Sequence, residues 1–259
     1  MPAVRRIGVV AEQRGVPAVI AVTWSGGGPE NPGGLNTVVM KAVERAIYTP
    51  DRIRRLVSGV PFFNEILRQD AAQFDVLLER CELLEAGSGD VVIRQGGSDS
   101  GLYFLLRGQL AVLADASPGP GTAPKVLNHI SPGEVFGTLS MLRDTPRTAT
   151  ICVDAATREA VLARIDFVFF SNITDFSVFT LPTKLAFYHM VVHNIRWTLE
   201  VNRMHDPHHE VVSLLRKVPV FSGERGSQAE LVALHQQAHI LADLLCRWNG
   251  TPASTGALG

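Results

Sequence analysis

The stretch Ser131–Thr150, with the sequence SPGEVFGTLSMLRDTPRTAT, is the part of the chain that decides the fold. Within it, Gly137 is followed by the short segment 138–142, TLSML, which is typical of a tight turn that leads into one short helix. The first N–H groups of such a helix have no partner within the helix and attract anions. Arg147 follows Pro146, whose fixed φ restricts the backbone, and its guanidinium can donate two parallel hydrogen bonds to the same anion. The pattern predicts a site for one phosphate group.

The same stretch resembles the phosphate-binding cassette of the cyclic-nucleotide-binding domain, in which F-G-E-hydrophobic-A-L is followed, after a short spacer, by P-R-x-A. The matching positions are Phe136, Gly137, Leu139, Pro146, Arg147 and Ala149, with Ser140 in place of the small alanine. Thr138 departs from the pattern, because the family has a glutamate there that contacts the ribose 2′-hydroxyl. The resemblance implies a ligand site made of Phe136, Gly137, Thr138, Leu139, Ser140, Arg147 and Thr148.

Two threonines bear on which ligand fits. With Thr138 in place of the glutamate, a charged acceptor is missing, and a hydrogen bond to a charged group contributes about 1.5–3 kcal/mol. We therefore expect a weakened cyclic-nucleotide site. Thr148 lies where cyclic-GMP-preferring members of the family carry a threonine, although threonine is equally common as a plain strand residue. Both cAMP and cGMP remain candidate ligands.

Short β-branched and aromatic segments surround the cassette, and glycine turns separate them at intervals of about eight to twelve residues, which predicts a sandwich or jelly roll. Two of these segments, 89–97 and 101–113, also resemble strand signatures of the same family. Further strands are expected at 126–130, 148–153 and 159–165. We therefore predict the α+β class, with a β jelly roll, a double-stranded β-helix-like barrel, from about Leu84 to Ile165 and flanking N- and C-terminal helices.

Helical patterns lie on both sides of the predicted roll. The sequence Val60-Pro61-Phe62-Phe63 and the amphipathic segment 70–84 resemble the entry to the family's domain. The long amphipathic segment 183–203 resembles the helix that covers the base as a lid, and Trp197 is its lid candidate, unless it packs buried against the roll. His189 and His193 are spaced like a metal-binding pair, but no further ligand is indicated, so no metal is predicted.

The two ends of the chain extend beyond this domain, which we place at 51–204. Residues 1–50 are predicted to hold a glycine- and proline-rich linker and a helix at 37–47, with Asp51 as the cap of the next turn. At the other end, 214–221 followed by 229–245 repeats the pattern of 56–63 followed by 71–84. This indicates a helical subdomain at 205–248, either a truncated second copy or a plain helical hairpin, and then a disordered tail at 249–259.

Composition narrows the function classes. The chain has 259 residues, of which 46% are apolar and 19% charged, and a formal net charge of -1, so no strong field favours nucleic acid or an anionic membrane. The cysteines, Cys81, Cys152 and Cys246, are odd in number and lack ligand-like spacing, which favours a reducing compartment. The apolar segment 16–24 is too short to span a bilayer, so we expect a cytoplasmic protein.

Two functions compete at this point. The first is a regulatory sensor that binds cAMP or cGMP and acts on an effector protein or through its own homodimer. The second is a degenerate module of the same fold that has lost the ligand and acts in protein–protein interaction. A transcription regulator is disfavoured, because the C-terminal part offers only scattered basic residues, namely Arg216, Lys217, Arg225 and Arg247. No catalytic motif is recognised, so we do not expect an enzyme.

Overall fold

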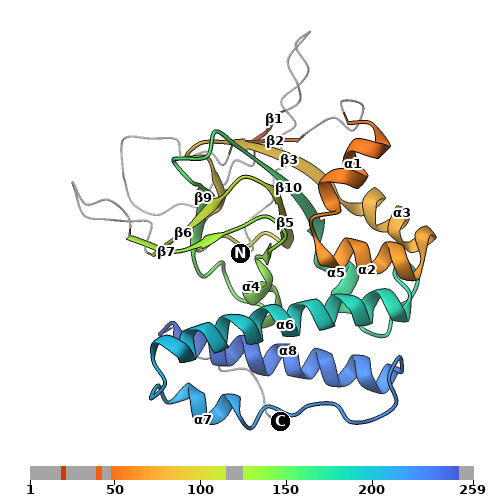
Figure 1. The fold of residues 1–259 in the computed structure, drawn as a ribbon, viewed down its shortest axis with the longest axis vertical. Helices are drawn as coiled ribbons and strands as arrows, with labels where there is room; N and C mark the ends of the chain where they lie inside the picture. The colour runs from red at the N-terminus through yellow and green to blue at the C-terminus, as the bar shows by residue number, and fades with distance from the viewer. Residues whose placement is uncertain (1–18, 22–38, 43–47, 115–124, 251–259) are drawn as a thin grey trace, which may run out of the picture.

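The computed structural model describes residues 19–21, 39–42, 48–114 and 125–250 (Figure 1). Antiparallel strands form a six-stranded sheet in the order β1-β2-β3-β10-β5-β8 and a four-stranded sheet in the order β4-β9-β6-β7. The strands are β1 Val19–Ala21, β2 Val39–Ala42, β3 Glu82–Gly87, β4 Val91–Ile93, β5 Gly101–Arg107, β6 Leu110–Ala114, β7 Lys125–Ile130, β8 Val135–Phe136, β9 Thr150–Val153 and β10 Glu159–Asp166. The predicted α+β jelly roll with flanking helices is confirmed.

Strand β5 separates two hydrophobic cores. Successive side chains of a strand point to opposite faces. One face of β5 presents Leu102, Phe104 and Leu106 to a core shared with the helices, whereas Tyr103 and Leu105 belong to the core inside the roll. Because both faces of β5 are covered, its residues from 101 to 106 are all buried, and only Arg107 at its end is exposed to solvent.

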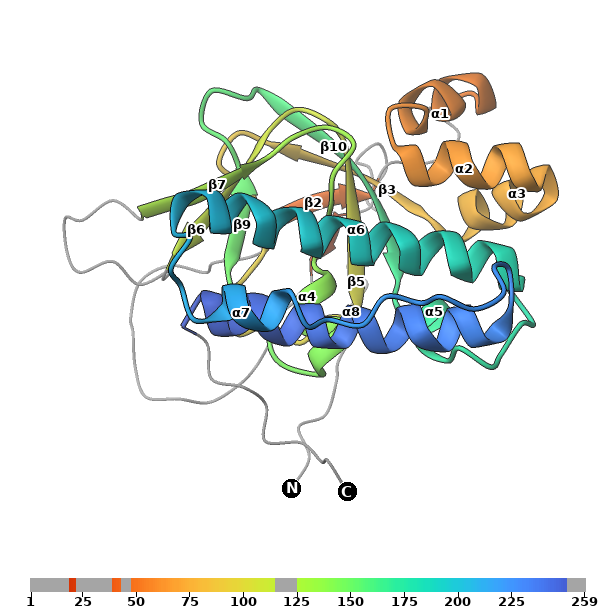
Figure 2. The same ribbon diagram turned by 60° about the horizontal axis from the view of Figure 1, so that its bottom comes forward.

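The helices lie on one side and at one end of the roll (Figure 1). They are α1 Pro50–Val57, α2 Pro61–Gln69, α3 Ala71–Arg80, α4 Thr138–Arg143, α5 Val168–Ser171, α6 Leu181–His205, α7 Val211–Leu215 and α8 Gln228–Trp248. The two longest, α6 and α8, pack side by side (Figure 2) and lie below the roll in the view of Figure 1, and α7 packs on α8. No helix in the described part of the chain is both long and apolar enough to cross a membrane.

Aromatic side chains join these helices to the roll. The ring of Phe62 on α2 stacks on Phe104 of β5 with centroids 5.7 Å apart, and Phe63 meets the same ring edge-on at 5.1 Å. Phe170 of α5 stacks on Phe187 of α6 at 3.9 Å, and both of these rings meet Phe62 edge-on. Stacked and edge-on pairs each add to the burial energy of the rings. The segment 60–63 thus positions α2 by burying two aromatic rings.

Several expected boundaries are corrected. Residues 39–42 form strand β2, paired with β1 and β3, so the helix expected at 37–47 is wrong over this stretch; sheet pairing overrode a weak helical periodicity. Thr49 caps α1 by accepting a hydrogen bond from the Arg52 N–H at 3.3 Å, whereas Asp51 lies in the first turn. Helix α3 ends at Arg80, because the chain enters β3 two residues later.

The repeat in the sequence is only partly a repeat in the structure. Pro61 begins helix α2, but the equivalent Pro219 lies in irregular chain between α7 and α8, and Val220 is 76% exposed. The first copy forms α2 because its two aromatic rings are buried against β5. The division into domains stays a prediction. The glycine- and proline-rich linker, at 25–34, and the tail from 251 lie outside the described residues.

Helix α8 carries a pair of histidines with a consequence for stability. His235 and His239 lie one turn apart with their Nε2 atoms 3.2 Å apart, and the ring of Tyr188 on α6 meets His235 edge-on at 5.3 Å. Burial, and secondly the neighbouring His239, lower the pKa of His235 from 6.5 to about 4.

This histidine makes the protein less stable in mild acid. Between pH 6.5 and about 4 the unfolded chain takes up a proton on His235 that the folded chain does not, so the free energy of unfolding decreases as the pH falls through this window. We expect the variant His235→Asn to show a shallower decrease in urea unfolding measured at pH 7, 5.5 and 4.5. Parallel pH profiles for the variant and the wild type would contradict the assignment.

Candidate functional site

The cassette is built around a left-handed turn at Gly137. This residue has φ 85°, follows strand β8 and is the N-cap of α4. A Cβ atom at Gly137 would lie 2.9 Å from Nη1 of Arg147 and 3.1 Å from the carbonyl oxygen of Gly101. Helix α4 ends at Arg143, and the next residue, Asp144, also adopts a left-handed conformation. Glycine is therefore required at Gly137 both for its backbone angle and for the close approach of Arg147.

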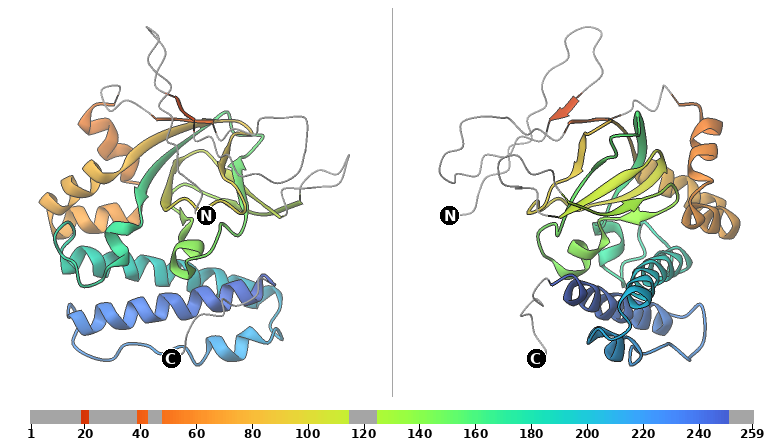
Figure 3. Two further views of the ribbon diagram at one scale, coloured as in Figure 1. Left: turned by 180° about the vertical axis from the view of Figure 1, so that it is seen from behind. Right: turned by 60° about the vertical axis from the view of Figure 1, so that its left-hand side comes forward.

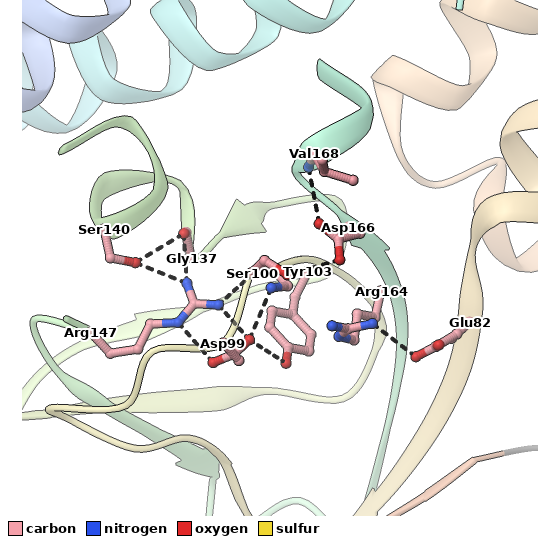
Figure 4. Close-up of polar contacts among 11 residues, drawn as sticks. Glu82, Asp99, Ser100, Tyr103, Gly137, Ser140, Arg147, Arg164, Asp166 and Val168 are labelled. Carbon is pink, nitrogen blue, oxygen red and sulfur yellow. Dashed lines mark hydrogen bonds and ion pairs between the residues drawn. The ribbon is translucent and has the colours of Figure 1, made fainter. Parts of the chain in front are cut away.

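The guanidinium of Arg147 is the centre of the site (Figure 4). The side chain is 2% exposed. Nε and Nη2 donate to the two carboxylate oxygens of Asp99 at 3.0 and 2.7 Å, and Nη1 donates to the Gly137 carbonyl at 2.7 Å and to Ser140 Oγ at 3.0 Å. Nη2 also donates to the Gly101 carbonyl. An arginine side chain has five N–H groups, and all of them are used here.

Asp99 is the residue that the sequence did not single out. It lies in the loop before β5, and its Oδ1 also accepts hydrogen bonds from the Gly101 N–H at 3.0 Å and the Tyr103 hydroxyl at 3.3 Å. Burial raises the pKa of this carboxyl, but the hydrogen bonds and charge of Arg147 outweigh it and lower the pKa below its ordinary value. Asp99 is therefore a carboxylate that occupies the anion-binding edge of Arg147.

The same loop is tied to the helical side of the roll. Ser100 Oγ donates to the carboxylate of Asp166 at 2.8 Å, and the other oxygen of Asp166 accepts the Val168 N–H at 3.0 Å at the start of α5 (Figure 4). Tyr103, next to Asp99, has its pKa raised to about 12, first by burial and then by the Asp99 charge. The loop that carries Asp99 is thus bound to the cassette through Arg147 and to the helical side of the roll through Asp166.

The structure brings together three of the residues named from the sequence, since Gly137 and Ser140 both accept hydrogen bonds from Arg147. Phe136 is buried and stacks on Tyr103 at 5.4 Å in the core of the roll. Thr138, the first residue of α4, is buried, with only 5% of its surface exposed.

The remaining three named residues are less closely tied to the site. Leu139 packs against the core shared with the helices, and Thr148 is half-buried. Trp197 is 60% exposed on α6, so the alternative that it packs buried against the roll is wrong, and its role as a lid stays a prediction. His189 pairs with Glu230 at 3.2 Å, and no group of three or more potential metal ligands exists within the ranges that the structure describes.

Comparison with known proteins identifies this region. The cyclic nucleotide-binding domain family matches residues 83–173. The cAMP-dependent protein kinase regulatory subunit of Dictyostelium discoideum is 29% identical over 75 residues, which are 29% of this chain and 23% of that protein. Acetyltransferase Pat of Mycolicibacterium smegmatis is 44% identical over 70 residues, 26% of this chain and 19% of that protein.

Among solved structures, the regulatory domain of Toxoplasma gondii PKA with cAMP overlaps 54% of this chain and 51% of its own at 19% identity and a TM-score of 0.39. The chain spans 23% and 20% of the length of two regulatory subunits that it matches, those of Dictyostelium discoideum and Mycosarcoma maydis. The family match includes the Asp99 loop, the cassette and Arg147, and the chain therefore contains a cyclic nucleotide-binding domain.

Proposed function

We propose that this protein is a non-catalytic regulatory sensor whose cassette binds the phosphate of a cyclic nucleotide, cAMP or cGMP. The observation that carries the proposal is the buried guanidinium of Arg147, held between the Asp99 carboxylate and the Gly137 turn within the matched domain. Planar guanidinium groups bind carboxylates and phosphates in the same two-bond geometry. The carboxylate of Asp99 thus marks where an anionic ligand group is accepted.

Nucleotide binding requires a rearrangement of this site. Because all five N–H groups of Arg147 already donate within the protein, a phosphate gains a bond from Arg147 only when a present acceptor leaves. Asp99 is the acceptor with the same charge as the phosphate, and its side chain is 44% exposed, so it can turn outward to water. The protein is expected to bind nucleotide weakly because Asp99 competes.

The variant Asp99→Asn tests this competition. The amide keeps the shape of the side chain but removes its charge, so the phosphate no longer competes with a charged acceptor. A hydrogen bond to a charged group contributes about 1.5–3 kcal/mol, which corresponds to about a tenfold to hundredfold increase in nucleotide affinity. Thermal-shift titrations of both proteins with cAMP, cGMP and cyclic di-GMP measure the effect, with 5′-AMP and 5′-GMP as controls. Ligand at a hundred times its dissociation constant stabilises the folded state by about 2.7 kcal/mol.

The second candidate function is a protein-interaction module without a nucleotide. It is favoured by the same saturated Arg147 and by Thr138, which is 5% exposed and lacks the charge that the family's glutamate provides. The two functions separate in one experiment. If a cyclic nucleotide raises the melting temperature of the wild type or of Asp99→Asn, the result supports the sensor. If no cyclic nucleotide raises the melting temperature of either protein, the result supports the interaction module.

The partner is proposed to be an effector protein or a second copy of the chain, contacted through the apolar side of α6. Trp197 and Met204 are 60% and 67% exposed and lie seven residues apart, which places them on one face of the helix. We expect the double variant Trp197→Ser/Met204→Ser to lose self-association in light scattering. If the wild type and the double variant both have the mass of a monomer, the chain does not self-associate, and a separate effector protein stays as the proposed partner.

A further inference from the structure

Helix α8 holds the cassette helix α4 by several contacts. Nε of Arg143, at the end of α4, donates to Oδ1 of Asp243 on α8 at 3.0 Å, and the Arg143 side chain is only 2% exposed. Burial lowers the pKa of His239, with smaller opposing effects first from the charge of Asp243 and then from its hydrogen bond to the backbone of Leu142. Cys246, 1% exposed, is hydrogen-bonded to Arg143. Residues 239, 243 and 246 share one face of α8. Helix α8 packs against α4, which is the short green helix beside the blue helix in Figure 3.

The two long helices contact different parts of the cassette region: α6 contacts the strand before it, and α8 contacts helix α4. Asn194 of α6, the helix expected as the lid, donates to the Val135 carbonyl at 3.0 Å, in the strand before the cassette. The helix that packs on α4 itself is α8, which follows the matched domain by more than fifty residues of chain. The position of α4 therefore depends on a C-terminal element outside the matched domain.

Helix α4 connects this contact to Arg147. Ser140, in the middle of α4, accepts a hydrogen bond from Arg147 Nη1, and Arg143, at its end, is bound to α8. Helix α4 is only six residues long, from Thr138 to Arg143, so a shift of the helix that takes Ser140 away from Arg147 also pulls on the contact between Arg143 and Asp243. The docked α8 stabilises the arrangement in which Arg147 has no N–H group left for a ligand.

We propose that α8 is a built-in clamp on the cassette helix that opposes nucleotide binding. The inference rests on the proposed function, and it adds the direction of regulation. Release of α8 lets α4 shift so that Ser140 no longer occupies Nη1 of Arg147, which adds to the outward turn of Asp99 that the proposed function requires. By thermodynamic reciprocity, a bound nucleotide favours the release of α8.

The variant Asp243→Asn tests the clamp, and Glu210→Gln is its matched control. Both remove the carboxylate of an ion pair made by α8, but Glu210, at the start of α7, pairs with Arg247 at 3.1 Å in an exposed position and makes no ion pair with α4. Calorimetry with cAMP and cGMP gives the dissociation constants. Hydrogen exchange of residues 138–143, and labelling of Cys246 followed by peptide mass spectrometry, report the contact without any ligand.

We expect Asp243→Asn to bind nucleotide at least about fivefold more tightly than the wild type, the lower range of typical coupling between sites. It should also show faster exchange in α4 and faster labelling of Cys246, whereas Glu210→Gln should resemble the wild type in all three. Unchanged or weaker binding by Asp243→Asn overturns the inhibitory direction, and unchanged exchange in α4 overturns the clamp. If neither protein binds nucleotide but α4 exchanges faster in Asp243→Asn, the clamp stands and the proposed function fails.

Discussion

Replacing Arg147 by alanine is expected to lower the free energy of unfolding by about 3 kcal/mol and to abolish nucleotide binding. Removal of one partner from a buried ion pair costs about 3–5 kcal/mol, and the partial exposure of Asp99 places this pair at the low end. The carbonyl oxygens of Gly101 and Gly137 also lose their donor. The sequence alone leads to the expectation that only binding suffers, but the contacts of Arg147 make it a structural residue as well.

Urea unfolding and calorimetry of Arg147→Ala measure the two effects separately. Arg107→Ala is the matched control, because Arg107 pairs with Glu159 on neighbouring strands of the same roll but is 51% exposed. Exposed pairs contribute at most about 1 kcal/mol, so this variant should stay close to the wild type in both measurements. If Arg147→Ala is as stable as Arg107→Ala, the network around Arg147 does not support the fold.

Replacing Gly137 by valine is expected to destabilise the protein by about 3 kcal/mol and to displace Arg147. A left-handed backbone costs a residue with a side chain about 1–2 kcal/mol, and crowding in a packed site costs about 1–3 kcal/mol more. The crowding arises because the new Cβ lies 2.9 Å from Nη1 of Arg147. The first group to be displaced is thus the arginine, before any ligand arrives.

Gly96→Val separates the two costs of this substitution. Gly96 has φ 78° in the same domain, but a Cβ there meets no atom within 4 Å, so this variant carries only the backbone strain. Urea unfolding should therefore show a loss of about 1–2 kcal/mol for Gly96→Val and a clearly larger one for Gly137→Val. Equal losses would show that Arg147 moves aside at no cost.

The fold could be predicted to a large extent from local patterns. The alternation in β5 assigns Tyr103 and Leu105 to one core and Phe104 to the other, and this follows from the period of a strand. The glycine turn of the cassette and the arginine after Pro146 lie within eleven residues of each other, so their proximity is a matter of short-range geometry. The helix predicted over residues 39–42 was wrong because sheet pairing with β3, a strand distant in sequence, outweighed a helix-like spacing of apolar residues.

The sequence by itself therefore determined the jelly roll, the flanking helices and the approach of Arg147 to Gly137 and Ser140. Only the tertiary structure decided that Asp99, 48 residues before Arg147, saturates the guanidinium, and that Asp243, 100 residues after Arg143, holds α4 in place. The physical reason is that periodicity and turn chemistry are encoded in neighbouring residues. An ion pair instead depends on where two distant segments are packed, and many carboxylates in the chain could have met either arginine.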